Sequence, residues 1–232
     1  MRGSGAWRVD DKGMGDDLLQ RSAAAAPRSF TFRSSEDPVL RAQPWRLATA
    51  LAAHADQKPR ERVLLYAMVF ALAPERVLEI GVRWGGGTRI IHAALSDLGR
   101  GELVSIDPDP ALEYDIGELG DRATLIVGAS PAELPRAREL AGENFDLVFV
   151  DGDHSERGVA ADLKGLLDVT SPGAVVLLHD AFHAPVARAI DAALIAGGWI
   201  DCGIVADTRN SGVRLETGQE VVYGGVRMLR RG

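Results

Sequence analysis

Short apolar segments alternate with amphipathic ones along most of the chain. The strand-like segments are five runs rich in aliphatic residues: 76–80, 102–106, 123–127, 145–150 and 174–178. The stretches between them have helical character. Strands joined by helical crossovers form a parallel sheet with both faces covered. The pattern therefore predicts an α/β fold built on a mostly parallel, Rossmann-like sheet with helices on both faces.

The last part of the chain predicts a different ending for this sheet. After Pro185 a helical stretch runs to about Ala196 and stops at a glycine pair, because glycine commonly ends helices. Two further strand-like runs follow, at about 199–206 and 220–229, with a polar stretch between them. We interpret these runs as a terminal hairpin. The sheet would then have seven strands, the last of them antiparallel.

The N-terminal third lacks this alternation. Residues 1–30 are rich in Gly, Ser, Ala and charge without a period, and they predict a flexible or docking arm. Residues 31–74 contain two helical stretches, from Trp45 to Ala53 and from Glu61 to Ala71, which we interpret as a helical cap. Residues 75–232 form the predicted α/β domain.

Composition narrows the class of protein. The chain is 46% hydrophobic and 25% charged, which is ordinary for a water-soluble domain. It has no apolar run long enough to span a membrane and no signal-peptide core. A single cysteine, Cys202, excludes a disulfide framework and a multi-cysteine metal site. We expect a cytoplasmic protein without a membrane partner.

The charge is distributed unevenly. Residues 1–62 hold 11 Lys and Arg against 8 Asp and Glu, whereas the rest of the chain holds 15 against 25. Binding of DNA or RNA normally needs a basic face to neutralise phosphates. The acidic α/β part therefore argues against a nucleic-acid partner and suits a neutral or cationic small molecule.

A glycine-rich segment follows the first predicted strand. Glu79 precedes Gly81 and Gly85, and Asp107 ends the next strand about twenty residues after the loop. This layout indicates a nucleotide-type cofactor site, although an ordinary strand-to-helix turn is the alternative. The dinucleotide pattern G-x-G-x-x-G is missing. The carboxylate of Glu79 would repel a pyrophosphate but suits a cationic ligand such as a sulfonium.

Glu79-Ile80-Gly81 together with Asp107 resembles the first two motifs of class I S-adenosylmethionine-dependent methyltransferases. The resemblance implies that the glycine loop passes under the methionine portion and that Asp107 holds the ribose. Gly128-Ala129-Ser130 is similar to the turn that borders the adenine in catechol-type O-methyltransferases. The cofactor-binding residues expected from these similarities are Glu79, Gly81, Thr88, Asp107, Pro108, Ala129 and Ser130.

A second polar cluster follows two later strands. Asp151, Asp153 and His154 lie on a turn after one strand, and His179 and Asp180 end the next. Neighbouring parallel strands lie about 4.8 Å apart, so these side chains can converge. Carboxylates suit Mg²⁺ or Mn²⁺, and imidazole also tolerates Fe²⁺ and Zn²⁺. The alternatives are helix capping by the acids and a structural role for His179.

This second motif resembles the cephalosporin-hydroxylase-like and macrolide-sugar O-methyltransferase branch, over roughly residues 77–187. Members of that branch use magnesium to bind and acidify a substrate hydroxyl. The resemblance implies that Asp151 and Asp180 are metal ligands and that His154 is the general base. Relatives often have Glu where this chain has His179, which we include among the expected ligands of Mg²⁺ or Mn²⁺.

The expected function is O-methylation of a small-molecule hydroxyl, on a natural-product sugar or a phenol. We expect the N-terminal segment and the 207–219 loop to contact this acceptor, and the N-terminal segment is also a candidate for homo-oligomer contacts. No metal or catalytic partners are assigned to His92 and His183, and His92 is interpreted as structural. The alternatives are a metal-independent methyltransferase, an NAD(P)-dependent oxidoreductase on a similar sheet, and a non-catalytic cofactor-binding protein.

Overall fold

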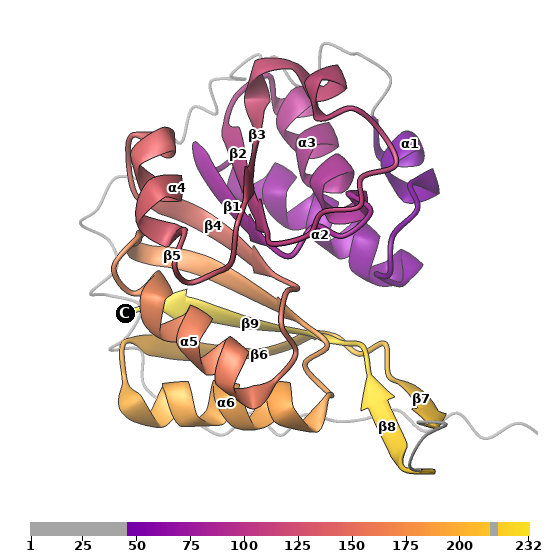
Figure 1. Ribbon diagram of the computed structural model, residues 1–232, viewed down its shortest axis with the longest axis vertical. Helices are drawn as coiled ribbons and strands as arrows, with labels where there is room; N and C mark the ends of the chain where they lie inside the picture. The colour runs from indigo at the N-terminus through magenta and orange to yellow at the C-terminus, as the bar shows by residue number, and fades with distance from the viewer. Residues whose placement is uncertain (1–45, 214–217) are drawn as a thin grey trace, which may run out of the picture. The chain divides into compact units, whose positions relative to one another are not determined.

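The computed structural model describes residues 46–213 and 218–232; the predicted arm at 1–30 and residues 31–45 of the predicted cap lie outside them. The described chain forms one seven-stranded sheet in the order β3-β2-β1-β4-β5-β9-β6 (Figure 1). Its strands are β1 Arg76–Ile80, β2 Glu102–Asp107, β3 Ala123–Val127, β4 Phe145–Val150, β5 Thr170–His179, β6 Trp199–Ala206 and β9 Val226–Arg231. The helices are α1 Leu47–Ala52, α2 Pro59–Leu72, α3 Gly86–Leu98, α4 Leu134–Ala141, α5 Glu156–Leu166 and α6 Ala184–Ala196, with a 3₁₀ segment at Ile116–Arg122.

The strand directions confirm the predicted fold class. Strands β1 to β5 pair in parallel, and β9 runs antiparallel to both β5 and β6. One boundary was predicted wrongly. The run 220–229 is not a single strand, because Gly224 and Gly225 take φ values of 85° and 81° and interrupt it. Residues before the break form β8 (Glu220–Tyr223), which pairs with β7 (Asn210–Val213) in a separate ribbon.

Alternation along the strands builds two hydrophobic cores. Odd and even positions of a strand point to opposite faces. Leu78 and Ile80 belong to a core with residues of α4, α5 and α6, whereas Val77 belongs to a core with residues of α2 and α3. Figure 1 shows these helices beside the sheet. All carboxyl ends of the parallel strands consequently meet at one edge, next to the N-termini of α3 and α5.

Helix α2 supplies both core and site residues. Pro59 occupies its first turn, and the backbone N–H of Lys58 donates to Glu61 Oε2 at 2.6 Å. Its buried stripe includes Leu65 and Val69 at helical spacing from Glu61. Its outer side is also apolar, with Val63 and Leu72 exposed.

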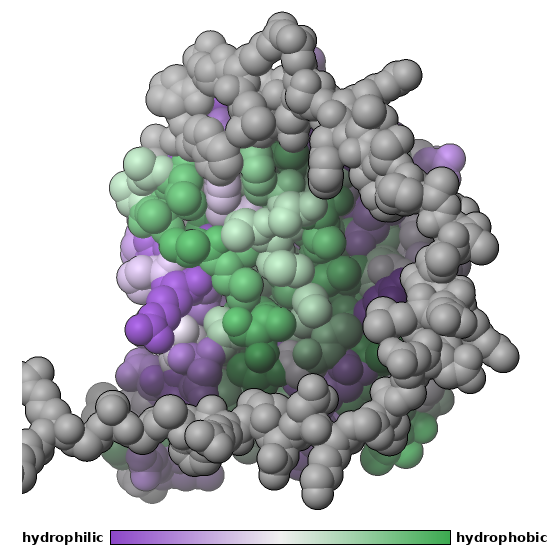
Figure 2. Space-filling view, turned by 180° about the vertical axis from the view of Figure 1, so that it is seen from behind, coloured by the Kyte–Doolittle hydropathy of each residue, from purple (hydrophilic) through white to green (hydrophobic). Residues whose placement is uncertain are grey.

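Figure 2 shows hydrophobic residues gathered on the face seen from behind the view of Figure 1. Oligomer formation through the N-terminal segment stays a prediction.

None of the helices in residues 46–213 and 218–232 is both long enough and apolar enough to cross a membrane.

Candidate active site

A cavity of about 740 Å³ opens at the carboxyl edge of the sheet. This is where open α/β sheets bind ligands. Its walls come from the loops that follow β1 to β5, together with residues 54–57 from the segment between α1 and α2. The predicted site residues on these walls are Gly81, Asp107, Pro108, Ala129, Ser130, Asp151, His154, His179 and Asp180.

The glycine loop is packed too tightly for side chains. Gly81 has φ 90°, and a Cβ built on it would lie 2.2 Å from the carbonyl oxygen of Asp151. A Cβ on Gly87 would lie 2.4 Å from Glu79 Oε1. Glycine at these positions therefore lets the loop lie directly against the end of β4 and against Glu79.

Glu79 lies behind this loop rather than on the cavity wall. Its side chain is 1% exposed, and Oε2 accepts hydrogen bonds from Thr88 Oγ1 at 2.6 Å and Ser105 Oγ at 2.7 Å. Its other oxygen, which faces Gly87, has no hydrogen-bond partner among the described residues. Burial raises the pKa of Glu79 to about 7. A buried carboxylate oxygen left unpartnered beside the loop fits a cationic ligand on the loop's other side.

Asp107 organises the loop from the next strand. Its Oδ2 accepts the backbone N–H groups of Val82 at 2.7 Å and Arg83 at 3.0 Å, and its Oδ1 accepts that of Asp109 at 2.8 Å. The carboxylate thus holds the glycine loop in place while lining the cavity. Contact with a ribose stays a prediction. Asp109, a second carboxylate on the same wall, was missed by the sequence reasoning.

Ser130 lines the cavity and has a partner that the sequence did not predict. Its hydroxyl donates to Asp162 Oδ1 at 2.5 Å, and burial raises the pKa of Asp162 to about 6. Asp162 lies on the buried side of α5 beside Val159 and Leu163. The sequence analysis missed Asp162, although an acidic residue among the apolar positions of a predicted helix indicates a buried polar contact.

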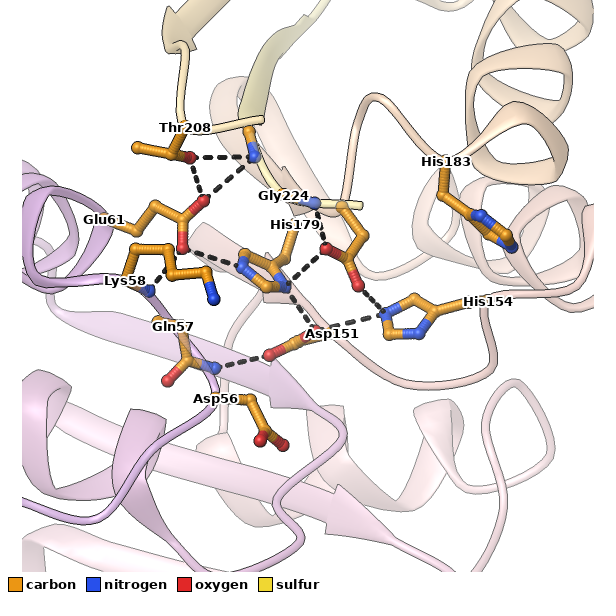
Figure 3. Close-up of polar contacts among 12 residues, drawn as sticks. Asp56, Gln57, Lys58, Glu61, Asp151, His154, His179, His183, Thr208 and Gly224 are labelled. Carbon is orange, nitrogen blue, oxygen red and sulfur yellow. Dashed lines mark hydrogen bonds and ion pairs between the residues drawn. The ribbon is translucent and has the colours of Figure 1, made fainter. Parts of the chain in front are cut away.

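The second motif converges as predicted. Asp151 Oδ1 lies 3.2 Å from His154 Nε2 and 2.9 Å from His179 Nδ1 (Figure 3). Asp180 Oδ2 lies 3.5 Å from His154 Nε2. One ligand atom from each of these four residues falls within 4.8 Å of the other three. We call Asp151, His154, His179 and Asp180 the Asp–His cluster.

Backbone geometry fixes the position of Asp180. Its φ is 53°, a left-handed conformation that non-glycine residues rarely adopt. Its Oδ1 accepts the N–H of Gly224 at 2.5 Å, just where β8 ends. The interruption between β8 and β9 therefore supports the site directly.

Two residues from the N-terminal segment complete the cluster (Figure 3). Gln57 Nε2 donates to Asp151 Oδ2 at 2.5 Å, and Glu61 Oε2 lies 3.1 Å from His179 Nε2. Glu61 Oε1 also accepts the N–H of Gly225 at 2.9 Å and the hydroxyl of Thr208. The sequence reasoning missed both residues, although an acid at helical spacing from Leu65 was a detectable signal.

Charges within the cluster balance one another. Burial opposes ionisation of Asp151, but the nearby imidazoles outweigh it and hold its pKa well below the usual range. Burial likewise opposes protonation of His154 and His179, and the carboxylates nevertheless raise both of their pKa values. Glu61 is buried as well, yet its contact with His179 lowers its pKa. Two arrangements satisfy these charges: protonated imidazoles between carboxylates, or a divalent cation held by neutral imidazoles.

The remaining histidines divide between structure and cavity. His92 lies 3.3 Å from Ser96 Oγ on α3, and His183 precedes α6 and stacks on Tyr223. His54 stacks on Trp84 with ring centroids 4.2 Å apart, and both rings line the cavity. Of the expected 207–219 contacts, none of the described residues lines the cavity, whereas Tyr223 of the same ribbon does.

Comparison with known proteins agrees with this geometry. Residues 78–181 match a family described as a methyltransferase domain. The chain is 32% identical over 145 residues to a catechol O-methyltransferase of Mycobacterium tuberculosis, covering 58% of this chain and 64% of that protein. It is 38% identical over 93 residues to catechol O-methyltransferase B of Danio rerio, covering 38% of this chain and 35% of that protein. The chain thus aligns with less than two thirds of the length of either relative.

Solved structures share the fold. An O-methyltransferase from Bacillus cereus in complex with S-adenosylhomocysteine matches with a TM-score of 0.59 at 21% identity, covering 84% of this chain and 94% of that one. The O-methyltransferase TomG from Streptomyces achromogenes matches with a TM-score of 0.58 at 20% identity, covering 82% and 91%. Residues 78–181 thus match a methyltransferase domain, and the described chain has the fold of these O-methyltransferase structures. Its sequence relatives are O-methyltransferases.

Proposed function

We propose that this protein transfers the methyl group of S-adenosylmethionine to a hydroxyl of a small molecule, a phenol or a natural-product sugar, with assistance from a divalent cation. The observation that supports this most is the shared cavity: the glycine loop and the Asp–His cluster line the same space. The catechol O-methyltransferases among the relatives indicate the class of acceptor.

The cofactor site would use the residues around the glycine loop. Glu79 would attract the sulfonium and amino cations across the glycine loop at Gly87, and Asp107 or Asp109 would bind ribose hydroxyls. The pair Ser130 and Asp162 would border the adenine. Since a sulfonium methyl is already activated, these residues need only align it with the acceptor.

The Asp–His cluster would activate the acceptor. Asp151, His179 and Asp180 would hold the cation, which lowers the pKa of a hydroxyl that binds to it. The hydroxyl oxygen then bonds to the methyl carbon while the carbon–sulfur bond breaks, leaving its electron pair on sulfur. His154, the most exposed member of the cluster at 33%, would accept the hydroxyl proton.

Methyl transfer from radiolabelled S-adenosylmethionine to catechol, simple phenols and reducing sugars tests this proposal. We expect transfer to at least one hydroxyl probe, suppression by EDTA and recovery with added Mg²⁺ or Mn²⁺. Full activity in EDTA would remove the cation and favour the metal-independent alternative, with His154 acting alone. Absence of S-adenosylhomocysteine binding, together with stabilisation by NAD(P)H, would favour an oxidoreductase instead.

A further inference from the structure

The donor set of the Asp–His cluster is unusual for magnesium. Mg²⁺ prefers oxygen ligands in nearly ideal octahedral geometry, with most of its remaining positions kept for water. Here one of the three proposed ligands, His179 Nδ1, is an imidazole nitrogen, and a second imidazole, that of His154, lies beside them. Imidazole is a ligand of transition cations, whose affinities for nitrogen donors rise along the first row.

The spacing of these donors suits a cation of that kind. Metal–ligand bonds of about 2.1 Å place adjacent ligand atoms about 3 Å apart. The separations around Asp151 Oδ1 are 2.9 Å to His179 Nδ1 and 3.2 Å to His154 Nε2. The pair Asp151 Oδ1 and His179 Nδ1 therefore lies at a distance typical of neighbours in a coordination shell, and Asp180 Oδ1 lies 3.7 Å from the same nitrogen.

Glu61 sets the orientation of His179. The imidazole is 5% exposed and the carboxylate 1%, and Glu61 Oε2 lies 3.1 Å from the Nε2 side of the ring. When Nε2–H donates to this carboxylate, the lone pair of Nδ1 faces Asp151 and the cavity. A carboxylate behind a histidine is the usual outer support of a histidine metal ligand. Glu61 lies on α2, outside the matched residues 78–181.

We propose that Asp151, His179 and Asp180 of the Asp–His cluster bind a first-row transition cation (Mn²⁺, Fe²⁺, Co²⁺ or Zn²⁺) in preference to Mg²⁺, with Glu61 as the positioning residue of His179. This inference rests on the cation assistance proposed above. It makes His179 the residue that determines which metal is bound.

Calorimetric titration of the chelator-treated 232-residue chain with Mn²⁺, Co²⁺ and Mg²⁺ separately tests the preference. We expect Mn²⁺ and Co²⁺ to bind at least about 100-fold more tightly than Mg²⁺, and bound Co²⁺ to show visible absorption bands of a nitrogen-containing site. Equal affinity for Mg²⁺ would overturn the inference and leave cation assistance standing. No binding of any of the three cations would overturn both.

Two substitutions locate the effect. His179→Asp replaces the buried imidazole with oxygen donors and should narrow the Co²⁺-to-Mg²⁺ affinity ratio at least about tenfold, whereas His92→Asp, on α3 outside the cavity, should leave it unchanged. Should His179→Asp fail to fold, His179→Asn serves the same purpose. An unchanged ratio in the folded variant would contradict the role of His179.

Glu61→Gln tests the positioning role. We expect Co²⁺ affinity to fall about 10- to 100-fold while S-adenosylhomocysteine affinity is unchanged. Because Glu61 acts through His179, the same change in the His179→Asp background should have little further effect on cation affinity. An equal loss in both backgrounds would show that Glu61 only supports the fold.

Discussion

The backbone of Gly81 lies directly against the backbone of Asp151. The N–H of Asp151 donates to the carbonyl of Ile80 at 2.8 Å, and a Cβ on Gly81 would lie 2.2 Å from the Asp151 carbonyl oxygen. The loop expected to hold the methyl donor and the turn expected to hold the acceptor's cation are thus one packed unit. A change in the position of one must move the other.

Gly81→Ala should damage both binding functions. The substitution places alanine in a left-handed backbone conformation and makes its Cβ overlap with the Asp151 backbone. Together these effects should lower the free energy of unfolding by about 2–4 kcal/mol. Binding of S-adenosylhomocysteine and of a cation should weaken together. Thermal denaturation and calorimetry measure these effects.

Gly99→Ala is the matched control. Gly99 has φ 71° but nothing within 4 Å of an added Cβ, so only the backbone strain of about 1 kcal/mol applies. Equal effects of the two substitutions would show that the contact between Gly81 and Asp151 contributes neither to stability nor to binding.

Glu79 should give the stability of the ligand-free protein a distinct pH dependence. Burial raises its pKa from the ordinary 4.5 to about 7 in the folded state. Between these values the folded protein binds more protons than the unfolded chain, so the free energy of unfolding falls as pH rises and levels off above about pH 7. The contribution of this group is about 3 kcal/mol across the window.

Glu79→Gln removes the ionisation and serves as the comparison. Denaturant unfolding from pH 4.5 to 8 should show the variant gaining stability relative to the unsubstituted protein as the pH rises. Parallel pH profiles of the two proteins would mean that Glu79 titrates normally and is not held in a water-poor environment.

Glu61→Ala should destabilise the fold as well as the site. It leaves His179 Nε2 and the hydroxyl of Thr208 without their buried acceptor and removes one of the two acceptors of the Gly225 N–H, which should cost about 2–4 kcal/mol in the free energy of unfolding. Glu143→Ala, on the exposed turn after α4, is the control and should cost less than about 0.5 kcal/mol. Denaturant titration of both variants measures these effects. Similar unfolding midpoints for the two variants would show that Glu61 does not stabilise the fold.

His154→Gln should separate chemistry from cofactor binding. Loss of the proposed base should lower kcat about 100- to 10,000-fold while the dissociation constant of S-adenosylhomocysteine stays unchanged. His92→Gln, distant from the cavity, should keep normal kinetics. Retained kcat in His154→Gln would assign proton removal to another group.

Much of the fold could be predicted from the sequence because short aliphatic runs, typical of buried strands, alternate with amphipathic stretches typical of helices. This alternation of strand-like and helix-like segments located all five parallel strands, and the acidic residues at the strand ends indicated the carboxyl edge of the sheet. The boundary of β9 was missed because a strand and a ribbon separated by Gly224 and Gly225 share one apolar pattern. Turn geometry, rather than hydropathy, decides where that strand begins.

Only part of the candidate site could be predicted from the sequence. Asp151 and His179 come from adjacent strands, so topology alone brought them together. Glu61 and Gln57 reach them from a helix and a loop whose docking on the sheet no local pattern encodes. Glu79 shows the converse: its motif was evident, but only packing reveals that the side chain lies behind the loop.

The most direct test of the central claim is a crystal structure of the protein soaked with S-adenosylhomocysteine and Mn²⁺. We predict the thioether sulfur at the glycine loop, near Gly81, and an anomalous Mn²⁺ peak bounded by Asp151, His179 and Asp180 in the same cavity. Homocysteine density away from the loop, or a cluster whose imidazoles pair only with carboxylates in saturating Mn²⁺, would contradict cation-assisted methyl transfer at this site.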